Sequence, residues 1–194
     1  MKLRKKTVVI ISIAIVVITG VSVLIFTQLV SPLKCTFVEA KSYKYIGNEY
    51  SGIMETDYEE AKSGLRPDIQ LLSDKDYDFS NPDDFTQVLL FYNVTNNSIF
   101  KIDNIEFFVA DIKVDKDRFL YKPDAVVTQS TGIGDTTLIR CDLDMYTKGL
   151  TVDEISNLVK GVKLEIQFTQ DIWGAKSQSI TIPNDLEFSE NKTM

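Results

Sequence analysis

The sequence predicts a mainly β chain in which an N-terminal membrane-spanning helix is followed by an antiparallel β-sandwich with one or two short helices. Three observations support this. An apolar run without charged residues extends from Thr7 to Val30. Beyond it, short segments alternate apolar and polar residues or are rich in β-branched and aromatic residues, and turn-forming residues separate them. One segment, Thr151–Lys160, has the apolar spacing of a helix.

The apolar run predicts a transmembrane helix at 7–30. No charged residue lies between Lys6 and Lys34, and a helix of this length measures about 36 Å, enough for a hydrocarbon core of about 30 Å. The basic segment 1–6 then stays in the cytoplasm, the chain beyond the helix lies outside, and lipid is the partner of the helix. The alternative is a cleaved secretory signal, but the run is longer than a usual signal core and lacks an Ala-x-Ala site.

The rest of the chain is predicted to form one extracytoplasmic domain over 31–183, followed by a flexible tail over 184–194. The segment 85–94 is apolar on both faces, which predicts a central strand. The segment 137–145 alternates with its apolar residues facing inward. Other strands are predicted at 35–46 (half-exposed, at an edge), 99–112 (with a bulge at Asp103-Asn104), 125–129, 162–169 and 176–182.

Two segments of different character interrupt the strands. At Thr151 and Glu154 the spacing of a capping box predicts a helix that ends before Gly161. The segment 49–84 is irregular, with a short helix expected at 55–63 and a short strand at 68–73. A connection of this length inside a compact domain is often functional, so a specific role is expected here.

Composition excludes some classes of function. Four of the 21 basic residues lie in 1–30, which hold no acid, so the remainder carries 17 basic and 28 acidic residues and a net charge of −11. Such a domain repels nucleic acid. The chain has no histidine, which removes the commonest general base and the commonest metal ligand. We therefore expect no cofactor and no enzymatic activity.

The acidic loop around Asp74, Asp76 and Asp78 has the alternating acids that open a calcium-binding loop. An EF-hand would need Gly at the sixth position and an acid at the twelfth, where this chain has Phe79 and Phe85. A weak, irregular cation site that also uses Asp83 and Asp84 remains open, and a solvated acidic loop is the alternative.

Two cysteines, Cys35 and Cys141, cannot build a four-ligand zinc site. Outside the cytoplasm they can form a disulfide, which would close a long loop. The apolar face on which Cys141 is predicted to lie favours a buried free thiol equally. Both alternatives stay open, because the sequence does not give the distance between the two Cα atoms.

Two further groups of residues have features of catalytic sites. Ser31 and Lys34 match Ser-x-x-Lys, but the companion Lys-Thr-Gly motif of that chemistry is missing. Asp142 and Asp144 share one face of a predicted strand, and acid–base work would require one of them to be desolvated. We expect both to point into solvent.

The order of the elements resembles a known family. A central strand ends in Val94-Thr95-Asn96-Asn97-Ser98, Gly134-Asp135-Thr136 precedes a later strand, and another strand lies near the end. This is similar to the telokin-like immunoglobulin modules of bacterial cell-surface proteins, over roughly residues 85–182. The resemblance implies an immunoglobulin-like sandwich that serves adhesion, ligand binding or assembly without catalysis. The long segment 49–84 and the helix at 151–160 depart from a minimal module.

The sequence therefore predicts a single-pass protein whose outer domain binds or assembles with a protein partner at the cell surface. The alternative is an accessory or sensor subunit of a membrane complex that acts through its transmembrane helix.

Overall fold

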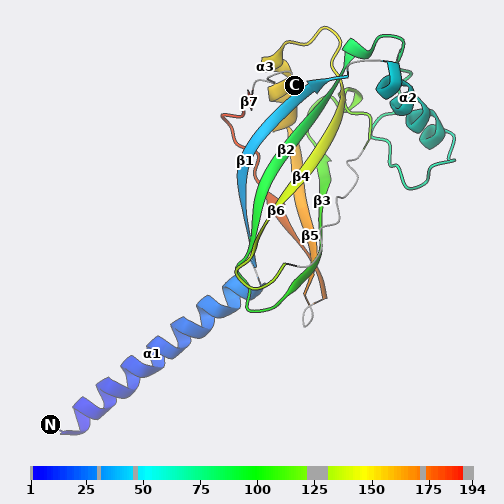
Figure 1. Cartoon of the computed structure of the whole chain (residues 1–194). Helices are drawn as coiled ribbons and strands as arrows, with labels where there is room; N and C mark the ends of the chain where they lie inside the picture. The colour runs from blue at the N-terminus through cyan, green and yellow to red at the C-terminus, as the bar shows by residue number, and fades with distance from the viewer. Residues whose placement is uncertain (1, 30–31, 46–47, 122–130, 171–173, 190–194) are drawn as a thin grey trace.

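Two β-sheets face each other across a shared apolar core in the computed structural model, which describes residues 2–29, 32–45, 48–121, 131–170 and 174–189 (Figure 1). The first sheet has the strand order β4-β2-β1-β7 and the second has the order β3-β5-β6. All strand pairs are antiparallel except β1 with β7. The strands are β1 (Leu33–Lys44), β2 (Phe85–Asn96), β3 (Ile102–Ile112), β4 (Thr136–Tyr146), β5 (Val162–Gln170), β6 (Gly174–Ile180) and β7 (Phe188–Ser189).

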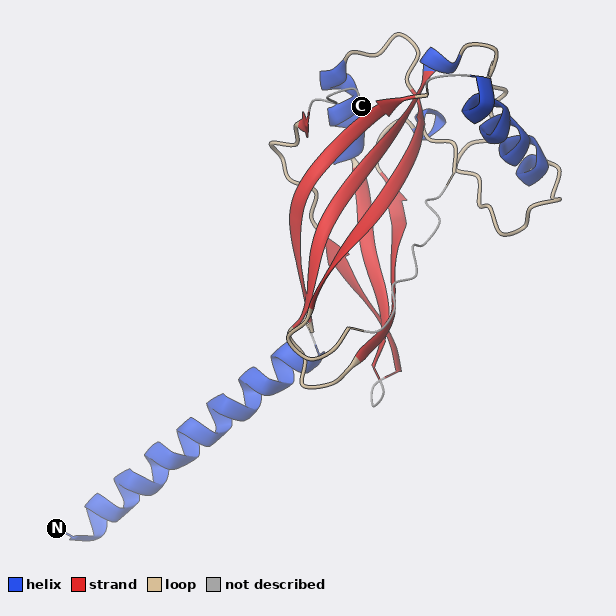
Figure 2. Cartoon of the chain, viewed as in Figure 1, coloured by secondary structure: helices blue, strands red, loops and turns tan. Residues whose placement is uncertain are grey.

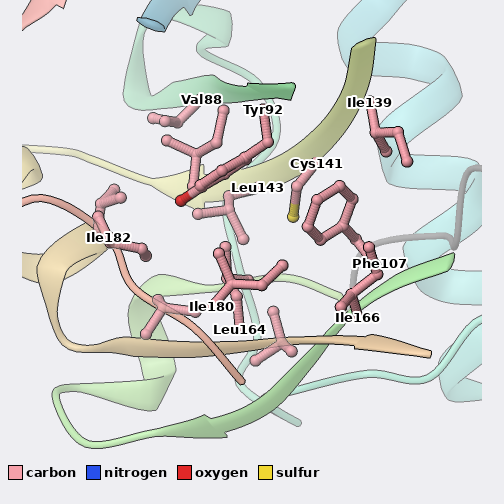
Figure 3. Close-up of a cluster of buried hydrophobic side chains, with 14 of the residues drawn as sticks. Val88, Tyr92, Phe107, Ile139, Cys141, Leu143, Leu164, Ile166, Ile180 and Ile182 are labelled. Atoms are coloured by element: carbon pink, nitrogen blue, oxygen red, sulfur yellow. The ribbon is translucent and has the colours of Figure 1, made fainter. Parts of the chain in front are cut away.

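The core forms because alternate residues of facing strands are apolar. The predicted inward faces of β4 and β5 are confirmed, since every second residue is buried from Ile139 to Met145 in β4 and along the whole of β5. On β2, the predicted central strand, residues of both faces are buried, including Leu89 on the face away from the other sheet. Figure 3 shows side chains of the two sheets meeting, among them Tyr92 and Cys141 from the first and Phe107, Leu164 and Ile166 from the second.

The bulge predicted at Asp103-Asn104 is confirmed. The register of β3 against β5 shifts between Asp103 and Glu106, and Asn104 has a φ of 51°. The predicted strand at 125–129 lies outside the described residues.

Helix α3 (Val152–Lys160) has the predicted capping box. The Thr151 hydroxyl accepts from Glu154 N at 3.3 Å, and a Glu154 carboxylate oxygen accepts from Thr151 N at 2.7 Å. Ile155 and Val159 face the core.

Helix α2 (Asn48–Lys62) begins earlier than the short helix predicted at 55–63. It covers a second apolar cluster of Met54, Tyr58, Phe79, Phe85 and Leu120. The Tyr58 hydroxyl donates to the carbonyl oxygens of Ser73 at 2.9 Å and Lys75 at 2.7 Å. The strand predicted at 68–73 is reduced to a single bridge between Leu71 and Tyr121.

Helix α1 (Lys2–Leu29) projects from the end of the sandwich (Figure 2). It does not match the prediction of a membrane-spanning helix. Among the described residues, no helix reaches both the length and the apolar character that crossing a membrane requires. The predicted transmembrane helix at 7–30 is thus wrong on this finding, and so is the single-pass placement with a cytoplasmic N-terminus and an extracytoplasmic domain.

Candidate binding groove at the edge of β1

An extra residue in β1 shapes the surface that we consider the candidate site. Phe37 pairs with Tyr92 and Glu39 pairs with the next residue of β2, Phe91, so Val38 has no partner in the β2 ladder. This is a β-bulge, which bends its strand locally. The Val38 side chain is 46% exposed.

The side of β1 away from β2 is only partly covered. The short strand β7 pairs with Ala40 and Lys41 alone. Between Lys34 and Glu39, no strand among the described residues pairs with this side of β1. At the start of the strand, the Gln178 side chain donates from Nε2 to the Leu33 carbonyl oxygen at 2.9 Å. The prediction of an edge strand is therefore confirmed for this half of β1.

The segment after Pro183 is held in place, contrary to the flexible tail predicted at 184–194. Leu186 is 4% exposed, and its carbonyl oxygen accepts from the Ser156 hydroxyl of α3 at 2.8 Å. The Ser189 hydroxyl donates to the Ala40 carbonyl oxygen at 3.2 Å. The sequence missed this because Leu186 and Phe188 are too few to give a strand pattern. Residues 190–194 lie outside the described part of the chain.

A groove with a volume of about 400 Å³ lies between this segment and the bulge of β1. We call it the β1 groove. Its apolar lining comes from Phe37, Val38, Ala40, Pro183 and Phe188, and its polar lining from Glu39, Asp185, Glu187 and Ser189.

The carboxylates of the β1 groove differ in their partners. Glu39 forms an ion pair with Lys41 at 2.9 Å. Asp185 and Glu187 are exposed, and no ion pair with either is found within the described residues. An open strand edge, an apolar lining and exposed acids together suit an extended polypeptide with basic and apolar side chains.

The structure does not bring the predicted calcium ligands together as a site. Asp76 pairs with Lys62, and an Asp78 carboxylate oxygen accepts from Ser80 N at 3.0 Å. Hydrogen bonds from the side chain and the backbone of Ser80 lower the pKa of Asp78. Asp84 pairs with Lys148 at 2.8 Å. In the described part of the chain, no group of three acidic or thiol side chains has the arrangement of a metal site.

The two cysteines are free, so the disulfide that the sequence left open is not formed. Cys35 lies on β1 opposite Val94, whereas Cys141 lies on β4 opposite Leu90, with β2 between them. Burial raises the pKa of the Cys35 thiol to about 11 and also raises that of Cys141. Both thiols are therefore protonated near neutral pH.

Asp142 and Asp144 are half-buried rather than fully exposed, which corrects that expectation. Asp142 pairs with Arg140 at 2.7 Å, and burial raises its pKa. An Asp144 carboxylate oxygen accepts from the Tyr45 hydroxyl and from Gln87 Nε2. Tyr45 and Gln87 hold the Asp144 side chain in place. Both are far from Asp144 in sequence, so no local sequence pattern predicts these contacts. In the other constellation, Lys34 is exposed at the edge of β1, and Ser31 lies outside the described residues.

Comparison with known proteins adds no candidate function, because no protein-family model matches this chain and no curated protein is significantly similar to it in sequence.

Proposed function

We propose that this protein is a non-catalytic binding or assembly module that holds an extended segment of a partner protein at the open edge of β1. The observation that carries the proposal is the half of β1 beside the β1 groove that no described strand pairs with on its outer side. Main-chain hydrogen bonds to a strand edge supply affinity for an added strand, and an adjoining pocket supplies choice among side chains.

The strand order supports an immunoglobulin-like module of the kind the sequence resembles. In such sandwiches strands A, B and E share one sheet, while C, F and G share the other. Assigning β1, β2, β3, β4, β5 and β6 to A, B, C, E, F and G reproduces the observed orders β4-β2-β1 and β3-β5-β6. The added strand β7 and helix α2 go beyond this minimal arrangement.

The proposal is tested by hydrogen exchange on the full chain, kept monodisperse in a mild detergent. The probes are two short peptides, one alternating Lys with Val and the other alternating Glu with Val. At least one peptide should slow amide exchange at residues 34–39 of β1. Exchange in β4, the opposite edge of the same sheet, should not change.

A matched pair of variants separates the β1 groove from the rest of the surface. Val38→Lys places a charged side chain at the open edge, where it should abolish the protection. Leu138→Lys adds the same charge on β4 at a residue that is 57% exposed, compared with 46% for Val38, and should leave the protection intact. The proposal fails if neither peptide protects residues 34–39, or if both variants behave alike.

A further inference from the structure

We infer that the β1 groove selects a basic strand, in which Lys or Arg side chains alternate with apolar ones. This inference rests on the proposed function and names the chemical class of its partner.

The charges of the β1 groove favour a basic partner. Of its three acids, Glu39 is already paired with Lys41 at 2.9 Å. Lys41 also lies over the ring of Phe91, with Nζ 5.2 Å from the ring centroid, which holds it on the outer face of the sheet. Asp185 and Glu187 therefore dominate the charge of the opposite wall. Two carboxylates without a described ion pair favour a cation that comes from outside the groove.

The packing of the wall keeps both carboxylates available. Leu186 lies between them in the sequence and is buried, and its carbonyl oxygen is bonded to Ser156 of α3. The Ser189 hydroxyl donates a hydrogen bond of 3.2 Å to the Ala40 carbonyl oxygen, which ties this segment to β1. An anchored segment with outward-facing carboxylates loses little conformational freedom when a partner binds.

The apolar lining of the β1 groove fits the apolar side chains of such a strand. Phe37 and Phe188 are half-buried, so each still offers a surface that an apolar side chain can cover. In an added strand, side chains point alternately to opposite sides. An alternating sequence can thus place apolar side chains in the groove while its basic side chains reach Asp185 and Glu187.

The acidic charges of the β1 groove also disfavour two other partners, an acidic strand and a second copy of this chain. An acidic strand would meet like charges on one wall, which weakens binding. A second copy of this chain brings a net charge of −7, so homotypic pairing at this edge is disfavoured in the same way.

The test measures the affinity of the full chain in mild detergent for the Lys–Val and Glu–Val peptides by titration calorimetry. The basic peptide should bind at least about tenfold more tightly, and added salt should reduce the difference. The double variant Asp185→Asn, Glu187→Gln should weaken binding of the basic peptide about fivefold.

A control double variant removes two negative charges from a different part of the surface. Glu55→Gln, Glu59→Gln on α2 lies across the molecule from β7 and should leave the affinity unchanged (Figure 1). The inference is overturned, while the proposed function stands, if both peptides protect β1 and bind equally or if the two double variants have the same effect. It is also overturned if ultracentrifugation shows a dimer in which β1 is protected without peptide. Absence of protection by either peptide rejects the proposed function itself.

Discussion

Tyr92 places a hydroxyl group inside the apolar core. Its side chain is 1% exposed, and its ring packs against Phe37 and Phe107 with centroid distances of 5.5 Å and 5.4 Å. Among the described residues the hydroxyl has no hydrogen-bond partner. A buried polar atom without a partner is destabilising, and replacing it by hydrogen removes that cost.

We predict that Tyr92→Phe raises the free energy of unfolding by about 1 kcal/mol. Tyr58→Phe is the matched control, because the Tyr58 hydroxyl makes two hydrogen bonds to backbone carbonyls, and its loss should cost about 1–2 kcal/mol. Chemical denaturation of both variants measures the two changes. A destabilised Tyr92→Phe variant would show that the hydroxyl is satisfied in solution.

At the scale of single residues, the sequence predicted burial well where alternation was regular and failed where a distant partner decides. Cys141 was expected on the inward face of its strand and is buried there. Asp144 looked equally regular on the outward face, yet Tyr45, 99 residues away in sequence, covers it. Periodicity describes one strand at a time and contains no information about what packs on its outer face.

Among the elements, α3 gives the clearest link between sequence and stability. Its capping box satisfies backbone amides that the helix itself leaves unpaired. Thr151→Ala should lower the free energy of unfolding by about 1 kcal/mol, as loss of an N-cap usually does. Thermal unfolding of this variant beside the unsubstituted chain is the measurement.

The capping box also predicts a pH dependence. Hydrogen bonds from Thr151 lower the pKa of Glu154 below its usual value. A folded-state pKa below the unfolded one gives stability that is present above the usual glutamate pKa and is lost as the pH falls through the lowered value. Glu154→Gln should therefore flatten the acid side of the stability profile, which denaturation at a series of pH values measures. A variant whose profile matches that of the unsubstituted chain would contradict this assignment.

At 49–84 the sequence predicted a helix but not its full extent, and at the end of the chain it missed the ordered segment, for the same physical reason. Both segments are held by contacts with residues remote in sequence rather than by their own periodicity. Helix α2 is held by the apolar cluster that includes Phe79 and Leu120, and the segment before β7 is held by α3 and β1. The candidate site therefore could not be read from the sequence, because one of its walls comes from a segment without a pattern.

For the whole molecule, α1 is the least integrated element. It makes no extensive contact with any strand or helix of the described chain. Its described apolar side chains are exposed, for example Val16 at 71% and Ile10 at 66%. Exposed apolar surface on this scale promotes association in water.

Removal of residues 1–31 should therefore leave the unfolding midpoint of the sandwich unchanged and should abolish self-association of the chain in buffer without detergent. Chemical denaturation and analytical ultracentrifugation test the two halves of this prediction. A truncated chain that fails to unfold cooperatively would show that α1 supports the sandwich.

The bulge at Val38 allows β1 to lose one residue without losing its pairing with β2. If that residue were deleted, Phe37 would precede Glu39 directly, and their partners Tyr92 and Phe91 are already consecutive. The shortened strand would run as an uninterrupted ladder, and Phe37 and Ala40 would still point to the interior. The sheet itself does not need the additional residue. Its effect is confined to the edge of the sheet, so the surface that we propose for binding can change there without disturbing the sandwich beneath it.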